Sequence, residues 1–127
     1  MNYLATSINE SPGITDKAGA TIEDVRGKAV KYSGGKIALA GAGEAVIGVG
    51  IMTNDKKTEV GADVDIQVKD IGLVCAGGEI AKGAELASDA NGKFVTAASG
   101  NYVAAIALED AASAGVYIKA RLVSYKK

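Results

Sequence analysis

The sequence predicts an all-β fold, a compact barrel or sandwich of short antiparallel strands and hairpins. The first observation is that 17 glycines stand against one proline, one phenylalanine and no tryptophan in 127 residues. The second is that apolar residues, 48% of the chain, are largely alanine, valine and isoleucine, which suit thin, closely packed strands. The third is that these apolar residues occur in short bursts separated by turn residues.

The length fits one domain, since a chain of this size buries roughly two-thirds of the surface that its unfolded form exposes. Residues 1–20 carry apolar side chains at no steady period, and Ser-Pro-Gly at 11–13 interrupts them. We expect this segment to form an extended N-terminal arm. Residues 21–127 are expected to form a single β domain.

The first strands of the domain are expected between residues 22 and 51. Turns are predicted at 33–35 (Ser-Gly-Gly), 41–43 (Gly-Ala-Gly) and 53–55 (Thr-Asn-Asp). Gly-Ala-Gly and the later Gly-Val-Gly at 48–50 resemble fragments of a phosphate loop. However, no Gly-x-Gly-x-x-Gly opens a helix and no Gly-Lys-Ser/Thr occurs. We interpret both as turns or close-packing glycines.

A half-buried strand is expected within the stretch 60–74, because apolar and polar residues alternate in its middle. Val64, Ile66 and Val68 alternate with Asp63, Asp65, Gln67 and Lys69. A Gly-Gly turn at 77–78 follows. Residues 89–92 (Asp-Ala-Asn-Gly) then predict a hairpin, because asparagine and glycine tolerate positive φ.

The end of the chain is also expected to be β structure. The alanine-rich run from Ala104 to Ala114 could be helical, but its β-branched neighbours and Gly115 favour a strand followed by a loop. The stretch from Val116 to Tyr125 alternates apolar and polar residues, which predicts the last strand.

An internal repeat emerges when the chain is shifted by 57 positions. This shift aligns Gly-Lys-Ile at 35–37 with Gly-Lys-Phe at 92–94, and Val49 with Ile106; Gly27 aligns with Gly83 after a slip of one residue. Two explanations remain open. Any two hairpins in a chain rich in glycine and alanine look alike, or a β-hairpin unit is duplicated and its copies pack together.

Composition argues against several classes of function. The 14 basic and 15 acidic residues nearly balance, whereas nucleic acid requires a clustered basic surface. The absence of histidine removes the commonest general base and the usual nitrogen ligand of zinc. No apolar run approaches the roughly 20 residues that span a bilayer. We therefore expect no nucleic-acid or membrane partner, no enzymatic activity, and no catalytic residue, cofactor or metal.

The single cysteine, Cys75, cannot form an internal disulfide and lies in an apolar run, so it is expected to be a buried small hydrophobe. No secretory signal opens the sequence, and synthesis in a reducing host cytoplasm is expected.

Three acidic pairs have the residue types of general acid–base or cation sites. These pairs are Glu23-Asp24, Asp63 with Asp65, and Glu109-Asp110. None lies in an Asp-x-Asp-x-Asp-Gly loop, so we interpret them as solvated charges.

A carrier function is the alternative. Asp16-Lys17-Ala18 and the Gly-Glu-Ile-Ala-Lys-Gly at 78–83 resemble steps of lipoyl domains, which implies a β-barrel carrier or small-ligand-binding module. In lipoyl domains the lysine lies at a hairpin tip, whereas here no clear strand precedes Lys17.

Three segments together resemble the capsid cement, or head decoration, proteins of tailed phages: 27–51, 64–100 and 102–123. The shared plan is a strand, Gly-Lys, Ala-Gly and apolar-Gly, then a Gly-Gly and Lys-Gly step, and a final strand after Ile-Ala-Leu-Glu at 106–109. The resemblance implies a β-tulip-like fold and a virion structural protein on the outer capsid surface. Such a protein binds the expanded head, bridges major capsid protein subunits and stabilises the shell. A homo-oligomer is expected, a trimer first and a dimer next.

Capsid or oligomer contacts are expected from the apolar residues of the arm and from the tyrosines. An extended arm can add a strand to a sheet edge, and tyrosine is favoured at interfaces, although ordinary packing at strand edges explains the tyrosines equally well. The candidates are Tyr3, Leu4, Ile8, Ile14, Tyr102, Tyr117 and Tyr125.

Overall fold

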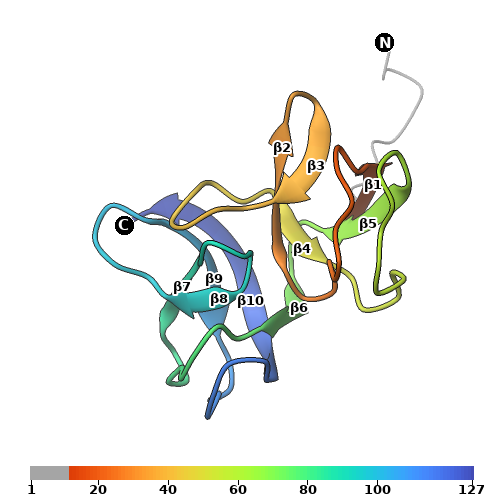
Figure 1. The fold of residues 1–127 in the computed structure, drawn as a ribbon. Helices are drawn as coiled ribbons and strands as arrows, with labels where there is room; N and C mark the ends of the chain where they lie inside the picture. Colours follow the sequence, from red (N-terminus) through yellow and green to blue (C-terminus); the bar gives the residue numbers. More distant parts are fainter. Residues whose placement is uncertain (1–11) are drawn as a thin grey trace, which may run out of the picture.

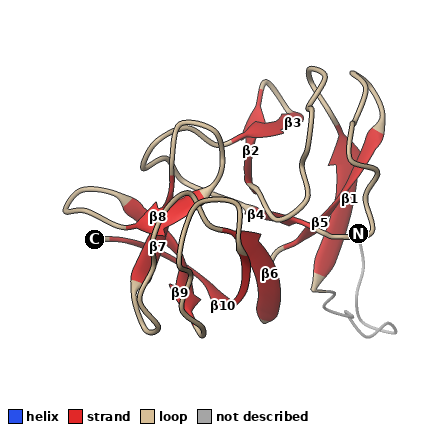
Figure 2. Cartoon of the chain, turned by 60° about the horizontal axis from the view of Figure 1, so that its bottom comes forward, coloured by secondary structure: helices blue, strands red, loops and turns tan. Residues whose placement is uncertain are grey.

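The computed structural model describes residues 12–127, which form ten strands and no helix (Figure 1, Figure 2). The prediction of an all-β fold is therefore confirmed. The strands are β1 (Gly13–Lys17), β2 (Ala29–Ser33), β3 (Lys36–Leu39), β4 (Gly48–Gly50), β5 (Asp63–Gln67), β6 (Ile71–Cys75), β7 (Glu85–Ser88), β8 (Phe94–Thr96), β9 (Tyr102–Ala107) and β10 (Tyr117–Lys126).

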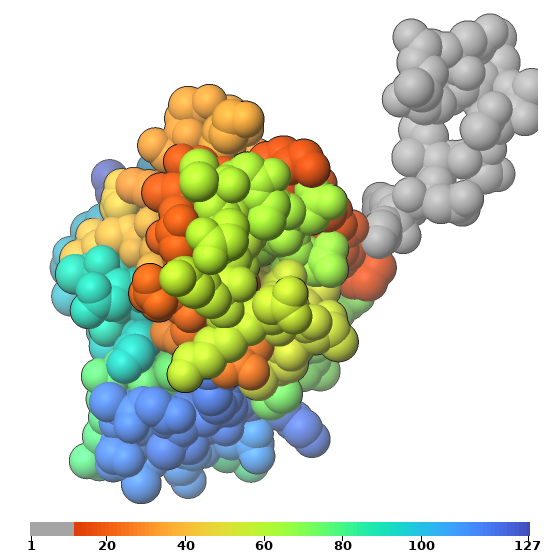
Figure 3. All heavy atoms as spheres, turned by 45° about the vertical axis from the view of Figure 1, so that its right-hand side comes forward, coloured from red at the N-terminus to blue at the C-terminus, as the bar shows by residue number. Residues whose placement is uncertain are grey.

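The strands form two five-stranded antiparallel sheets with one connectivity. The first sheet has the order β1-β5-β4-β2-β3 and the second the order β6-β10-β9-β7-β8, so each strand of the second sheet is five places later than its counterpart. Figure 1 shows the sheets side by side, the first in red to green and the second in green to blue. In the space-filling view the residues of the first sheet, in red to yellow-green, adjoin the C-terminal residues of the second sheet, in blue, which lie below them (Figure 3).

The repetition extends to the register of the strands. Ala29 pairs with Val49 in the first sheet, and Glu85 pairs with Ile106 at the same place in the second. In each sheet an isolated parallel bridge also links the residue just after one edge strand to the opposite edge strand. Ala18, after β1, pairs with Ile37 of β3, and Ala76, after β6, pairs with Phe94 of β8. The sequence repeat therefore reflects a duplicated β unit that is larger than a hairpin. We call residues 13–67 the first repeat and residues 71–121 the second repeat.

Each repeat buries an equivalent set of side chains. The first repeat buries Ala18, Ile22, Val30, Ile37, Val64 and Ile66, and the second buries Ala76, Ile80, Leu86, Phe94, Ile118 and Ala120. Phe94, the only phenylalanine in the chain, is fully buried where the first repeat has Ile37. Ala29, Ala40 and Val49 of the first repeat join the core of the second, so apolar packing connects the two units.

Backbone hydrogen bonds also join the repeats. The Ala29 N–H donates to the Gly92 carbonyl at 2.7 Å, and the Cys75 N–H donates to the Gly27 carbonyl at 2.8 Å. Gly27 has a φ of 71°, and a Cβ there would lie 2.6 Å from the ring of Tyr117. Glycine is therefore required at this junction both for its backbone conformation and for the approach of the aromatic ring.

Several local predictions are confirmed. The turns at 33–35 and 89–92 connect β2 to β3 and β7 to β8. In β5, Val64 and Ile66 are buried while Asp63 and Asp65 are exposed, as the alternation predicts. The alanine-rich run begins as strand β9 and continues as a loop.

Further predictions concern single residues. Cys75 is buried. Gly48 and Gly50 are close-packing glycines, because an added Cβ would lie 2.3 Å and 2.0 Å from backbone oxygens.

The predicted N-terminal arm, residues 1–20, lies partly outside the described residues. From Gly13 to Lys17 the chain is strand β1, which pairs with β5 along its whole length. This part of the range therefore belongs to the first sheet. The boundary at residue 20 remains a prediction.

Candidate interaction surface

The residues predicted at an interface lie in different parts of the fold. Tyr3, Leu4 and Ile8 lie outside the described residues. Ile14 lies on β1 of the first sheet, 36% exposed. Tyr102 and Tyr125 lie on β9 and β10 of the second sheet, in adjacent register, since Tyr102 pairs with Lys126 and Tyr125 with Val103. The structure thus places these two tyrosines on neighbouring strands, at successive register positions, where side chains alternate between the faces of a sheet. Ile14 lies apart from them, in the first sheet.

Tyr102 and Tyr125 are both exposed, at 39% and 42%, and both have polar neighbours. The Tyr125 hydroxyl donates to Glu85 Oε2 at 2.5 Å, and Lys127 Nζ lies 3.0 Å from Glu85 Oε1. The hydrogen bond from Tyr125, aided by Lys127, lowers the pKa of Glu85. The Lys126 ammonium lies 5.7 Å from the centre of the Tyr102 ring, a cation–π distance. These contacts fix two amphipathic rings at the surface.

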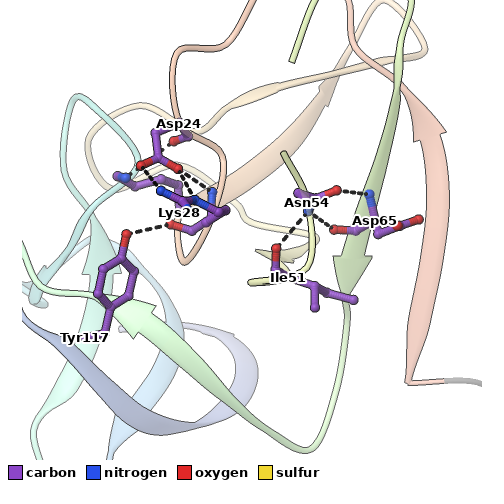
Figure 4. Close-up of polar contacts among 7 residues, drawn as sticks. Asp24, Lys28, Ile51, Asn54, Asp65 and Tyr117 are labelled. Atoms are coloured by element: carbon purple, nitrogen blue, oxygen red, sulfur yellow. Dashed lines mark hydrogen bonds and ion pairs between the residues drawn. The ribbon is translucent and has the colours of Figure 1, made fainter. Parts of the chain in front are cut away.

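Tyr117 has an internal role between the repeats (Figure 4). Its hydroxyl donates to the Arg26 carbonyl at 3.4 Å, and its ring lies against Gly27. Burial is the main cause that raises the pKa of Tyr117. The side chain is half-buried. Its ring and hydroxyl therefore connect β10 to the loop before β2.

The same loop is held by a carboxylate–guanidinium pair. Asp24 accepts hydrogen bonds from Arg26 Nε at 3.0 Å and from the second guanidinium nitrogen at 3.2 Å, a bidentate geometry. The bond from Arg26 lowers the pKa of Asp24. Lys28 Nζ donates to the Asp24 backbone carbonyl at 3.3 Å, also visible in Figure 4. The pair therefore stabilises the segment that reaches Tyr117.

Tyr32 is an exposed aromatic that the sequence-based selection missed. It lies on β2 next to the glycine turn, 44% exposed, and its hydroxyl donates to Asp16 Oδ2 at 2.7 Å. This bond lowers the pKa of Asp16 and raises that of Tyr32. Its position beside the turn predicted at 33–35 indicates that the ring is exposed, because a residue near a hairpin tip has few neighbours to cover it.

An apolar groove lies between β4 and β6. It has a volume of about 390 Å³ and is lined by Val49, Gly50, Ile51, Met52, Gln67, Ile71, Gly72, Leu73 and Lys119. An adjoining hollow is lined by three of these residues, Ile51, Gln67 and Ile71, together with Pro12, Gly13 and Asp70. Most lining side chains are apolar, and three of them, Met52, Ile71 and Leu73, are exposed.

The wall of the groove at Ile51 is held by a side-chain amide. Asn54 Nδ2 donates to the Ile51 carbonyl at 3.0 Å and to the Asp65 carbonyl at 2.8 Å, and Asn54 Oδ1 accepts from the Asp65 N–H at 2.9 Å (Figure 4). The amide thus pairs with the backbone of β5 as a strand residue would. This geometry fixes the loop that follows β4 beside the groove.

Other candidate sites lack the expected arrangement. Lys17 lies within strand β1 and its ammonium is 2.7 Å from Asp63 Oδ1, so it is not at a hairpin tip as in lipoyl domains. Within residues 12–127 no three His, Cys, Asp or Glu side chains gather as a metal site. Nor does that part of the chain contain a helix long and apolar enough to span a membrane.

The fold and surface therefore define an all-β protein that exposes aromatic and aliphatic side chains. The sequence model of the phage cement proteins matches residues 12–122, and the chain belongs to this family. The family indicates a structural role in the phage capsid and association with the virion. The resemblance seen in the sequence is thereby confirmed.

A solved structure has the same fold. It is described as the head fiber gp8.5 N base in bacteriophage phi29, with a TM-score of 0.68 and 20% identity. The alignment covers 91% of this chain and 96% of that chain. No curated protein matches the sequence.

Proposed function

We propose that this protein is a capsid cement protein that binds the outer surface of the expanded phage head and bridges neighbouring major capsid protein subunits. Membership of the phage cement family is the observation that carries the proposal. The protein would be made in the host cytoplasm and join the shell after expansion. It acts mechanically and performs no catalysis.

The geometry supports a binding role. Exposed tyrosines and aliphatic residues on a rigid β scaffold provide contact area at low entropic cost, because the backbone is already ordered. The duplicated repeats also give one chain two similar but non-identical surfaces. Two surfaces on one body can contact two subunits, and the second contact forms at high effective concentration once the first is made.

A homo-oligomer, a trimer first and a dimer next, would multiply this effect. Several modest contacts repeated by symmetry stabilise a thin shell without any single strong contact. We propose Ile14, Tyr102 and Tyr125, with the arm residues Tyr3, Leu4 and Ile8, as contributors to capsid or oligomer contacts. Tyr117 would contribute through the part of its ring that remains exposed.

Co-sedimentation with purified, expanded and undecorated heads tests the proposal. The protein should pellet with these heads at a saturating, fixed ratio to the major capsid protein, and it should pellet less with unexpanded heads. Equal recovery in the pellet with and without heads would refute it. Mass measurement of the protein in solution by light scattering reports the oligomeric state separately.

A further inference from the structure

The duplication allows equivalent surfaces of the two repeats to be compared. The paired strands β1 and β5 of the first repeat correspond to β6 and β10 of the second, since Gly13–Gln67 and Ile71–Arg121 occupy the same register position. Counting along the strands, Thr15 and Asp65 correspond to Leu73 and Lys119. A structural need of the fold should be met at both places, whereas a difference points to a use specific to one repeat.

In the first repeat this face is polar and internally paired. The Thr15 hydroxyl donates to Asp65 Oδ1 at 2.6 Å, and the Lys17 ammonium lies 2.7 Å from Asp63 Oδ1. The charged residues on this face, Lys17, Asp63 and Asp65, therefore each have a partner across the β1–β5 pair. Such a surface needs no further ligand.

In the second repeat the same face carries aliphatic residues opposite cations. Ile71 and Leu73 are 59% and 40% exposed, and their cross-strand partners are Arg121 and Lys119. Neither cation forms an ion pair with any residue in 12–127. The acid beside them, Glu109, accepts its hydrogen bond from the backbone N–H of Lys119 at 2.7 Å. Exposed aliphatic side chains and uncompensated cations thus share one face.

The groove extends this face, because Ile71, Leu73 and Lys119 also line it together with Met52. The backbone of β6 is already engaged near both ends: the Cys75 N–H donates to Gly27, and the Ile71 carbonyl accepts from Gln67 Nε2 at 2.8 Å. A ligand on this face would therefore contact side chains and the groove more than the strand edge.

We propose that the outward β6–β10 face, with the adjoining groove, binds a protein segment that presents apolar side chains flanked by carboxylates. Apolar side chains of the partner would cover Ile71, Leu73 and Met52, and its carboxylates would pair with Lys119 and Arg121. The inference rests on the proposed function, in which the partner is a subunit of the shell. Charge complementarity of this kind favours specificity and fast association.

Charge reversal tests the assignment in the head-binding assay. The double variant Lys119→Glu/Arg121→Glu should raise the dissociation constant for heads by about 100-fold, since attraction becomes repulsion at two places. Leu73→Asp should weaken binding in the same direction. The matched control Lys36→Glu/Lys82→Glu changes the charge equally at exposed positions outside β6 and β10 and should alter binding by less than about threefold. Circular dichroism and the urea midpoint verify that each variant is folded.

Two outcomes would overturn the assignment. The first is that the Lys119→Glu/Arg121→Glu variant binds heads as the control does. The second is that it changes the oligomeric state of the free protein, which would make a second copy the occupant.

A peptide titration tests the same face without heads. A peptide of alternating Asp and Leu should shift the methyl resonances of Met52, Ile71 and Leu73 in methyl-labelled protein, and an alternating Lys and Leu peptide should not. Absence of these shifts, or equal shifts with both peptides, contradicts the inference. If the wild-type protein fails to bind heads but responds to the Asp–Leu peptide, the proposed function fails while the chemistry of the face stands.

Discussion

The close approach of strand β4 to the loop before β2 leads to a specific prediction for Gly50→Ala. A Cβ at position 50 would lie 2.0 Å from the Val25 carbonyl oxygen and 2.8 Å from its carbon, whereas real Cβ contacts are essentially never below 3.0 Å. The two backbones must therefore separate by about 1 Å. Gly50 also accepts a hydrogen bond from the Gly27 N–H and donates one to the Lys28 carbonyl, at 2.8 Å and 3.0 Å.

The expected cost combines overpacking with weakened hydrogen bonds. Overpacking contributes about 1–3 kcal/mol, and each lost hydrogen bond contributes about 1 kcal/mol. Gly50→Ala should therefore lower the free energy of unfolding by about 2–5 kcal/mol, a large share of the stability of a domain. The matched control is Gly78→Ala, because a Cβ there has nothing within 4 Å and the residue has no left-handed φ. It should change stability by less than about 1 kcal/mol.

Equilibrium urea unfolding measures both variants. Circular dichroism and tyrosine fluorescence are suitable probes, since the chain has five tyrosines and no tryptophan. A shift of the midpoint at constant slope reports a change in stability. If Gly50→Ala unfolds at the same urea concentration as Gly78→Ala, the close approach between β4 and Val25 is refuted.

Three further predictions concern the core of the second repeat, the loop before β2 and the buried cysteine. Phe94→Ala should destabilise the protein by about 3–5 kcal/mol in the same urea assay, because the ring is fully buried in the core of the second repeat; a cost below about 1 kcal/mol would contradict that packing. The pKa of Asp24 is lowered from 3.8 by Arg26, so the pair stabilises the fold above pH 3.8 and loses this contribution as pH falls through the folded pKa. Asp24→Asn should reduce the fall in urea midpoint on acidification, and an unchanged acid profile would argue against the pair. Cys75 is buried, so a thiol reagent should label it only as fast as the protein unfolds; rapid labelling of folded protein would place the thiol at the surface.

Local patterns in the sequence were sufficient for the elements but not for their arrangement. The alternation around Val64 and Ile66 predicts β5 because one face of that strand is buried. The Asp-Ala-Asn-Gly turn predicts the β7–β8 hairpin because the turn chemistry is local. By contrast, β1 pairs with β5 across about 50 residues of chain, and no local pattern specifies such a partner. The break between β5 and β6 was likewise not predicted, since Asp70 adopts a φ of 70°, which is uncommon outside glycine.

The candidate surface was only partly accessible from the sequence. Tyr102 and Tyr125 could be selected as exposed aromatics, and the structure places them in adjacent register. Tyr117 has the same side chain, but its ring meets Gly27, which is remote in sequence. Leu73 and Lys119 become neighbours only through the pairing of β6 with β10. The contrast between the two repeats therefore required the three-dimensional register.

The most direct test of the cement role is the heat stability of the shell. Expanded, undecorated heads are heated with and without saturating protein, and release of the packaged contents or loss of the head particle is followed with temperature. The proposal predicts a higher disruption temperature with the wild-type protein and a smaller rise with the Lys119→Glu/Arg121→Glu variant. Saturating binding of the wild-type protein with an unchanged disruption temperature would contradict the stabilising role.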